Sequence, residues 1–412
     1  MLRGAAGVPD DQQPEFGEQV HAASQAPWWQ RHNHDPVKVD RIVQDAGRIC
    51  LTPGRAGVVL LRTSVQLRPL EGTQKMKRRT LGATGMSVSE FTLGAMMFGQ
   101  MGNPDHEDSI RIIHRALEAG INTIDTADVY SGGESEEIVG RAIKGRRDDL
   151  VIATKFGMPM GEDPNQRGGS RKWIVREVEN SLRRLDTDYI DLYQMHRPDY
   201  ETNLGETLSA LSDLVRAGKV RAFGSSMFPA ELMTQAQWVA ERQGSDRFAT
   251  EQPMYSIFTR KHEAAVFPTA QRYRLGVLTF SPLNGGWLSG RTDPAAGHRA
   301  SRRPSVYDPS TPTGQLKAAA VKELTAVAGQ AGLTLPQLAT AFVRAHPAVT
   351  SVLIGPRTAD QLDGLLSGAD IELTDDILDR IDEIVPPGTD LNPRDNYAAT
   401  PPAIADARLR RR

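Results

Sequence analysis

An alternation of short β-rich runs with amphipathic helical stretches, repeated from Met76 onward, constrains the fold more than any other feature of this chain. We interpret eight runs as strands: FTLGAM (91–96), INTIDTA (121–127), LVIATK (150–155), IDLYQMH (190–196), VRAFGSS (220–226), ATEQPMYS (249–256), VLTFSPL (277–283) and VTSVLIG (349–355). This alternation is typical of parallel strands joined by crossover helices. Eight such units close most economically into an α/β fold of the (β/α)8 TIM barrel type.

The segments around these strands carry their own signals. Residues 203–218 repeat leucine and valine on one helical face, with Asn203 placed to cap the start and Gly218 placed to end the helix. Residues 78–88 predict an N-terminal hairpin that plugs the bottom of the barrel. Residues 374–385 repeat apolar residues at helical spacing, which predicts an extra C-terminal helix packed outside.

A doubly wound open sheet shows the same alternation and is the rival architecture. It usually carries G-x-G-x-x-G after an early strand, to bind a dinucleotide. The nearest match, Gly94 to Gly99, has the wrong glycine spacing and leads into more loop instead of a helix. The pattern therefore favours the barrel.

Three regions follow from composition and pattern. Residues 1–75 are rich in Gln, Pro, Arg and His and lack a sustained period, so we expect a poorly patterned extension. Two interpretations stay open: a start-site artefact, with translation beginning at Met76, and a disordered interaction arm. Residues 76–394 are expected to form the barrel, and residues 395–412 a C-terminal tail.

Charge and cysteine content exclude several classes of protein. The formal net charge is −2 with both signs interspersed, which argues against nucleic acid and membrane surfaces as partners. The single cysteine, Cys50, cannot form an internal disulfide, and no Cys/His cluster has the spacing of a metal site. No apolar run reaches the roughly 18 residues of a membrane span, and the N-terminus lacks a secretory core. We therefore expect a cytoplasmic protein without a metal.

Polar residues gather where the predicted strands end, which is where barrel enzymes place their catalytic groups. Asp125 ends the second strand, Tyr130 follows five residues later, Lys155 ends the third strand and His196 the fourth. Each alone has an ordinary role as a turn, packing or surface residue. Together they suit reduction of a carbonyl, which needs a proton for the developing alkoxide.

Each of the four has a role in such a reaction. An unperturbed phenol has a pKa of about 10 and is a reluctant acid at neutral pH. An ammonium roughly 4 Å away stabilises the phenolate by on the order of 4 kcal/mol at a surface-like dielectric. Tyr130 would then be the general acid, supported by Lys155 and Asp125, and His196 would orient the carbonyl.

The same residues carry a resemblance to a known family. The motifs are IDTADVY (124–130), GGESEEIVG (132–140), ATKFG (153–157), IDLYQMHRPD (190–199), FGSS (223–226), FSPLNGGWLSGR (280–291) and LIGPRTADQL (353–362). With these motifs in order from about Met76 to Arg394, the sequence resembles the aldo-keto reductase family. The resemblance implies a catalytic tetrad of Asp125, Tyr130, Lys155 and His196.

The resemblance also implies NADPH (NADP) as the cofactor, extended across the barrel mouth. Ser226 and Gln252 match positions that bind the nicotinamide carboxamide, and Phe280 matches the position on which the nicotinamide ring stacks. Positions that contact the pyrophosphate are matched by Ser281, Leu283, Gly285 and Gly290. Positions that contact the adenosine 2′-phosphate are matched by Gly355, Arg357 and Gln361.

The chain departs from the family at two places. Met227 stands where the family often has Asn, and Gly364-Leu365 stand where it often has Glu-Asn for the adenine, with Asp363 as a weak substitute. Beside the nicotinamide, Met97, Phe98 and Met158 are expected to form an apolar wall for a small-molecule carbonyl substrate. The oligomeric state stays open.

Two alternatives to the reductase remain. One is a regulatory subunit that binds NADPH and turns over slowly. The other makes Lys155 the Schiff-base lysine of an aldolase-type barrel. The neighbouring Asp125, Tyr130 and cofactor motifs favour NADPH-dependent reduction of an aldehyde or ketone to an alcohol over both.

Overall fold

The computed structural model describes residues 76–291, 307–396 and 401–411. The expectation for residues 1–75 therefore lies outside the described residues. Within the described ranges, no helix is both long enough and apolar enough to cross a membrane.

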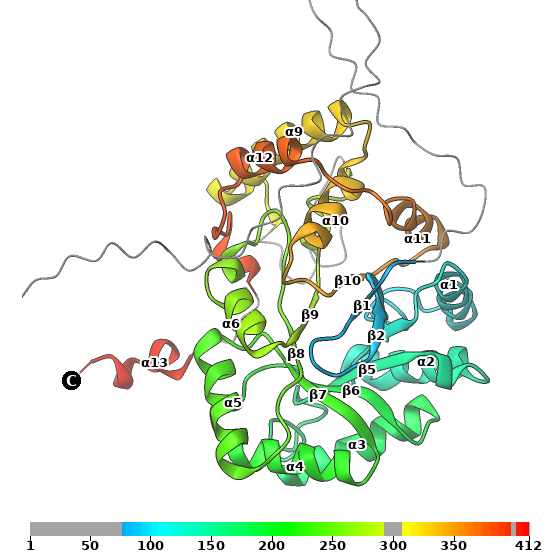
Figure 1. The fold of residues 1–412 in the computed structure, drawn as a ribbon, viewed down its shortest axis with the longest axis vertical. Coiled ribbons are helices and arrows are strands. Elements are labelled where there is room, and N and C mark those ends of the chain that lie inside the picture. The colour runs from blue at the N-terminus through cyan, green and yellow to red at the C-terminus, as the bar shows by residue number, and fades with distance from the viewer. Residues whose placement is uncertain (1–75, 292–306, 397–400, 412) are drawn as a thin grey trace, which may run out of the picture. The chain divides into compact units, whose positions relative to one another are not determined.

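Eight parallel strands close into a barrel in the order β10-β3-β4-β5-β6-β7-β8-β9, so the predicted TIM barrel is confirmed (Figure 1). The strands are β3 (Phe91–Gly94), β4 (Thr123–Asp125), β5 (Val151–Phe156), β6 (Ile190–Met195), β7 (Val220–Ser226), β8 (Thr250–Gln252), β9 (Gly276–Thr279) and β10 (Ser351–Ile354). Each lies inside or within one residue of its predicted run. Because all eight strands are parallel, their C-terminal ends meet at one mouth of the barrel.

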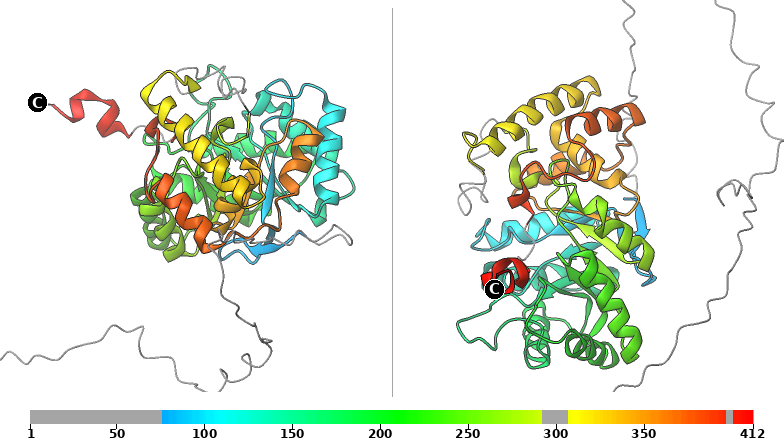
Figure 2. Two further views of the ribbon diagram at one scale, coloured as in Figure 1. Left: turned by 90° about the horizontal axis from the view of Figure 1, so that it is seen from above. Right: turned by 90° about the vertical axis from the view of Figure 1, so that its left-hand side faces the viewer.

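Helices cover the outside of the strands (Figures 1 and 2). They are α1 (His106–Glu118), α2 (Glu134–Ile143), α3 (Arg171–Leu185), α4 (Leu204–Arg216), α5 (Ala230–Gln243), α6 (Val266–Tyr273), α9 (Pro312–Gln330), α10 (Leu335–Ala345), α11 (Ala359–Leu366) and α12 (Asp375–Ile384). A further helix of four residues, α13 (Pro402–Ala405), belongs to the last described range and is not one of this covering set. Short 3-10 turns are η2 (Tyr130–Gly133), η3 (Arg147–Asp149), η4 (Lys261–Ala264), η5 (Asn284–Gly286), η7 (Pro393–Asp395) and η8 (Ala407–Leu409). The predicted extra C-terminal helix is α12, which lies beside α9 in both figures.

The ends of α4 show how local sequence sets the elements. The Asn203 side chain accepts a hydrogen bond from the Gly205 amide at 2.8 Å, which satisfies one of the donors that a helix start leaves free. Gly218 has a φ of 74°, a left-handed conformation in which glycine carries no steric cost, so the chain turns there toward β7.

The predicted N-terminal hairpin, β1 (Arg78–Thr80) and β2 (Ser87–Ser89), closes the bottom of the barrel. Its Leu81 and Val88 are fully buried in a cluster with five apolar side chains of the barrel strands: Val151, Ala153, Leu192, Leu278 and Leu353. Gly82 in its turn has a φ of 56°, and a Cβ there would come 2.3 Å from the Gly276 backbone nitrogen. The hairpin therefore fits the barrel only because this turn residue has no side chain.

Candidate active site

Four polar side chains meet at the C-terminal mouth of the barrel. Asp125 is the last residue of β4, Lys155 lies near the end of β5, and His196 directly follows β6. Tyr130 opens η2, the short turn after β4. The structure thus brings together the four residues that the sequence singles out from strand ends.

Lys155 lies between the other members of this group. Its Nζ donates to Asp125 Oδ1, to the Thr126 carbonyl at 2.8 Å and to the Tyr130 hydroxyl at 3.4 Å. The residue is 0% exposed. Burial alone would lower the pKa of Lys155, but the Asp125 carboxylate and the Tyr130 hydroxyl outweigh burial and raise that pKa above its ordinary value. The ammonium form is therefore the stable one.

His196 completes the group from the side of β6. Its ring packs edge-to-face against Tyr130, with centroids 5.6 Å apart and planes at 84°. Burial, and then the positive charges of Lys155 and Arg197, hold the pKa of His196 well below its usual range. The imidazole is therefore neutral, and its Nδ1 has no hydrogen-bond partner among the described residues.

Two buried glutamines extend the group into the barrel. Gln194 of β6 donates from Nε2 to Asp125 Oδ2 at 3.1 Å, and Gln252 of β8 donates to the same oxygen at 2.8 Å. The cofactor motifs of the sequence predict a role for Gln252, whereas no motif predicts one for Gln194. The available signal was a polar residue at an inward position of a strand whose six residues are all buried.

The residues expected near a nicotinamide also lie at this mouth. Ser226 ends β7 opposite Gln252 in the sheet register, and the Ser226 hydroxyl donates to the Gln252 carbonyl at 2.9 Å. Phe280 follows β9 and is half-buried, bridged to Met254 of the neighbouring segment. These three residues thus come from the adjacent ends of β7, β8 and β9.

Two turns could hold phosphate groups. The first, residues 281–290, holds three of the expected residues, Leu283, Gly285 and Gly290, and begins with Ser281 at a φ of 59°. Gly285 has a φ of 68°, and a Cβ there would come 1.8 Å from the Tyr307 hydroxyl, so the turn requires glycine at that point.

The second turn follows β10 and leads into α11. Gly355 is exposed and Arg357 is half-buried just before the helix. Thr358 caps α11 by accepting from the Gln361 amide at 3.3 Å, and the Gln361 side chain accepts from the Arg357 amide at 2.9 Å. A helix start with a guanidinium beside it is a suitable place for an anion.

The family model described as Aldo/keto reductase family matches residues 90–386. This chain belongs to that family. The match begins just before β3 and ends just after α12, so it spans the whole barrel with all four residues of the mouth group. Membership makes the chain an oxidoreductase by family.

The chain is also similar to individual proteins with different names. The chain is 38% identical over 324 residues to "Uncharacterized oxidoreductase YrpG" of Bacillus subtilis, covering 76% of this chain and 96% of the relative. It is 36% identical over 297 residues to "Aldo-keto reductase YhdN" of the same species, covering 70% and 88%. It is also 34% identical over 322 residues to "Probable voltage-gated potassium channel subunit beta" of Oryza sativa, covering 75% and 97%.

The two departures from the family pattern have structural counterparts. Met227 has a φ of 60°, a left-handed conformation that Asn adopts more readily than Met, and its side chain is buried. The Asp363 carboxylate accepts two hydrogen bonds of 2.6 Å from the Arg115 guanidinium. The Asp363 carboxylate is therefore committed to an ion pair with α1.

The three residues expected in a substrate wall differ in exposure. Met158 is half-buried, and Met97 is 8% exposed. Phe98 is 0% exposed and belongs to the main hydrophobic core of this family barrel. Its ring has no free surface in this structure, because the loop after β3 folds it inward.

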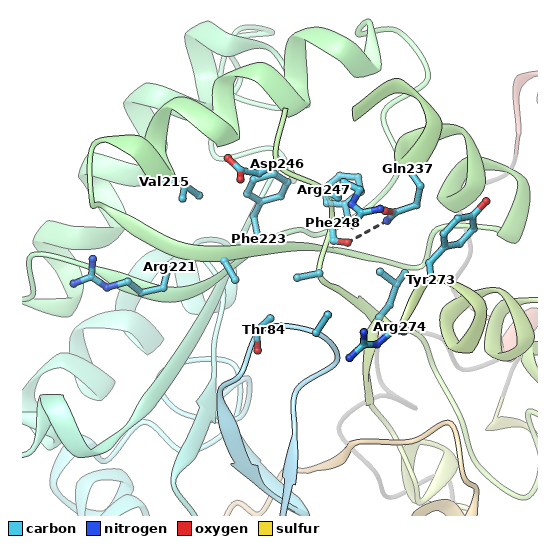
Figure 3. Close-up of a pocket in the computed structure, with 14 residues that line it drawn as sticks. Thr84, Val215, Arg221, Phe223, Gln237, Asp246, Arg247, Phe248, Tyr273 and Arg274 are labelled. Carbon is cyan, nitrogen blue, oxygen red and sulfur yellow. Dashed lines mark hydrogen bonds between the residues drawn. The ribbon is translucent and has the colours of Figure 1, made fainter. Parts of the chain in front are cut away.

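A cavity of about 240 Å³ lies at the opposite, N-terminal end of the barrel, beside the hairpin turn (Figure 3). Thr84 of the turn and Arg221, at the start of β7, are among its lining residues. Figure 3 shows the Arg221 guanidinium pointing away from the hollow, and that group stacks over Tyr189 at 4.4 Å. None of the four residues of the mouth group lines this cavity, so the mouth remains the candidate active site of this aldo/keto reductase.

Proposed function

We propose that this chain reduces an aldehyde or ketone to an alcohol with NADPH, and that Tyr130 gives the proton. The observation that carries the proposal is the fully buried Lys155 ammonium, held by Asp125 and 3.4 Å from the Tyr130 hydroxyl. A phenol beside a fixed positive charge can release its proton and leave a stabilised phenolate.

Lys155 and Asp125 act on Tyr130 rather than on the substrate. The three donors of the ammonium are directed at Asp125, the Thr126 carbonyl and the Tyr130 oxygen, so the lysine cannot turn away. Because Lys155 donates to the phenol oxygen, the proton of the Tyr130 hydroxyl is left to hydrogen-bond a carbonyl oxygen. The neutral imidazole of His196 would orient that oxygen as a hydrogen-bond donor without adding charge.

The turns at the mouth fit a dinucleotide. Ser226 and Gln252 would hold the carboxamide, Phe280 would stack on the nicotinamide, and Ser281, Leu283, Gly285 and Gly290 would approach the pyrophosphate. Gly355, Arg357 and Gln361 would bind the 2′-phosphate, which favours NADPH over NADH. When bound, this cofactor supplies a hydride to the carbonyl carbon. Gly285 and Gly290, with φ of 68° and 74°, carry no side chain that would keep a phosphate away from the backbone of this turn.

Met97 and Met158 would contribute the apolar wall for the substrate. Phe98, which is 0% exposed, would act as a residue of the hydrophobic core. The substrate class is therefore a small molecule with a carbonyl group beside an adaptable apolar surface. For the domain organisation, we propose that residues 76–394 act as the catalytic unit.

A second function is favoured by a specific observation. The rice relative is named a probable potassium channel subunit beta, and it matches over 97% of its own length. An NADPH-binding subunit with slow turnover is therefore the alternative for this chain. It would keep cofactor affinity, but would need a partner rather than a substrate.

The test is NADPH consumption with a panel of aldehydes and ketones, comparing the native chain with Tyr130→Phe. We expect turnover in the native chain and a loss of about 10²- to 10⁴-fold in the variant, with NADPH affinity kept, because only the proton donor is removed. Equal turnover in both would refute the role of Tyr130. Tight NADPH binding without turnover on any carbonyl would favour the subunit.

A further inference from the structure

The layer of side chains nearest the barrel mouth is polar. Asp125, Gln194 and Gln252 come from β4, β6 and β8, which alternate around the closed sheet. In TIM barrels, side chains from alternate strands share a layer, and branched apolar residues dominate these layers. Gln194 is 0% exposed and Gln252 is 2% exposed. Packing alone would not select two amides here, because each must be hydrogen-bonded when buried.

The two oxygens of the Asp125 carboxylate have different partners. Oδ1 accepts from the Lys155 ammonium, whereas Oδ2 accepts from Gln194 at 3.1 Å and Gln252 at 2.8 Å. A buried carboxylate is costly unless its lone pairs accept hydrogen bonds, and these donors supply both sides. They also oppose rotation of the carboxylate, because turning it would break the amide contacts while moving Oδ1 off the ammonium.

We propose that Gln194 is a positioning residue for proton transfer: its amide holds Asp125 Oδ2, so that Oδ1 stays on Lys155 and Lys155 stays on Tyr130. This inference rests on the proposed function of Tyr130. Gln252 contacts the same oxygen, but the proposed function also assigns Gln252 to the nicotinamide carboxamide. Gln194 directs its amide at Asp125 and accepts from Gln252 at 3.4 Å, so it is the donor committed to the carboxylate.

The effect of losing this donor has a definite sign. Without the Gln194 amide, more of the Asp125 charge is left uncompensated beside the Lys155–Tyr130 pair. Negative charge disfavours a phenolate. Among the described residues, Lys155 from β5 donates to the Tyr130 hydroxyl and His196 after β6 packs against its ring, while Asp125 from β4 pairs with Lys155. His196 is neutral, so the change reaches Tyr130 through the Asp125–Lys155 pair.

The experiment measures kcat against pH, from neutral to strongly alkaline, at saturating NADPH with an aldehyde that the native chain reduces. The first variant, Gln194→Met, has a similar length but no donor. We expect its alkaline limb to move up by on the order of one pH unit, and its kcat at neutral pH to fall by about tenfold. The dissociation constant for NADPH should stay within about twofold, since the change lies behind Asp125.

Gln194→Asn is the second variant, because it keeps a polar side chain but draws the amide back from Asp125. The same direction of shift is expected. Gln237→Leu is the matched control: it removes another buried amide, whose Nε2 donates to the Phe248 carbonyl at 3.1 Å near the bottom of the barrel (Figure 3). This control should lose stability but keep the native pH limb.

Each outcome has a distinct meaning. A native pH limb in both folded Gln194 variants would make Gln194 a packing residue and overturn the inference. So would a failure of both variants to fold, because that would assign Gln194 to the structure. Absence of turnover in the native chain, or full turnover in Tyr130→Phe, would instead overturn the proposed function.

Discussion

Replacing Lys155 by methionine removes the positive charge on which the proposed chemistry depends. Its Nζ lies 3.4 Å from the Tyr130 hydroxyl. At an effective dielectric constant of about 20, two unit charges at that separation interact by about 5 kcal/mol. The Asp125 carboxylate on the other side of the ammonium opposes this stabilisation of a phenolate. We take about half of the 5 kcal/mol as the net stabilisation of the phenolate by Lys155. This corresponds to nearly two pH units at 1.36 kcal/mol per unit.

Lys155→Met should therefore move the alkaline limb of kcat up by about two pH units and lower kcat at neutral pH by about 100-fold. It should also lower the free energy of unfolding, because the Asp125 side chain is only 2% exposed and loses its counter-charge. Breaking a buried ion pair by removing one partner costs about 3–5 kcal/mol. The assays are NADPH consumption against pH and urea unfolding.

Lys317→Met is the matched control for this variant. Lys317 is also a buried lysine in an ion pair, with its Nζ 2.5 Å from Asp395. Its replacement should lower stability to a similar extent, but leave the pH limb at saturating NADPH in place, because Lys317 contacts Asp395, Asn284 and Trp287, none of which belongs to the mouth group. A Lys155→Met enzyme with a native pH profile, or an equal shift in both variants, would refute the reasoning.

Two further predictions follow from the cofactor turn and from a buried acid. Arg357→Ala should weaken NADPH binding by about 10- to 100-fold and NADH binding by far less, measured by fluorescence titration; an equal loss for both would mean that Arg357 does not read the 2′-phosphate. Burial raises the pKa of Glu251 from 4.5 to about 8, so its contribution to stability is complete below about pH 4.5 and is lost as pH rises through about 8. Glu251→Gln can keep its partners at Ser225 and Phe228. As pH rises from about 4.5 to about 8, the free energy of unfolding should fall in the native chain relative to that of the variant. The same pH dependence of unfolding in both proteins would contradict the buried acid.

The fold could be predicted because its signals are local and repeated. Each strand is a short β-rich run and each helix has its own period, and the absence of a dinucleotide-binding glycine motif favours closure of the eight units over an open sheet. The strand ends were less predictable. β4, for example, spans only Thr123–Asp125 although the predicted run continues to Ala127, and the amides of Thr126 and Asp128 still donate to the β5 carbonyls of Ala153 and Lys155.

The mouth group could be anticipated because strand ends of a parallel barrel share one edge. What could not be read from the sequence depends on contacts between distant residues. Gln194 has no motif of its own and gains its meaning only from Asp125, which lies 69 residues earlier. Asp363, a weak substitute for the adenine contact, similarly has a partner that no local pattern predicts: Arg115, 248 residues away. Sequence patterns can therefore predict where a functional residue lies, but its hydrogen-bond and ion-pair partners depend on how distant parts of the chain pack together.

Polar and apolar layers of the same barrel have divided roles. At the bottom, Leu81 and Val88 of the hairpin seal a cluster of small and branched side chains from the barrel strands. At the mouth, the Asp125–Lys155 pair is buried with its amides, and a buried ion pair of this kind adds little net stability compared with apolar packing. The mouth layer can remain polar because the hairpin and the lower layers stabilise the barrel without it. The Lys155 ammonium beside the Tyr130 phenol is then held in place by Lys155 and Asp125, which lie on the rigid strands β5 and β4 and not on a loop.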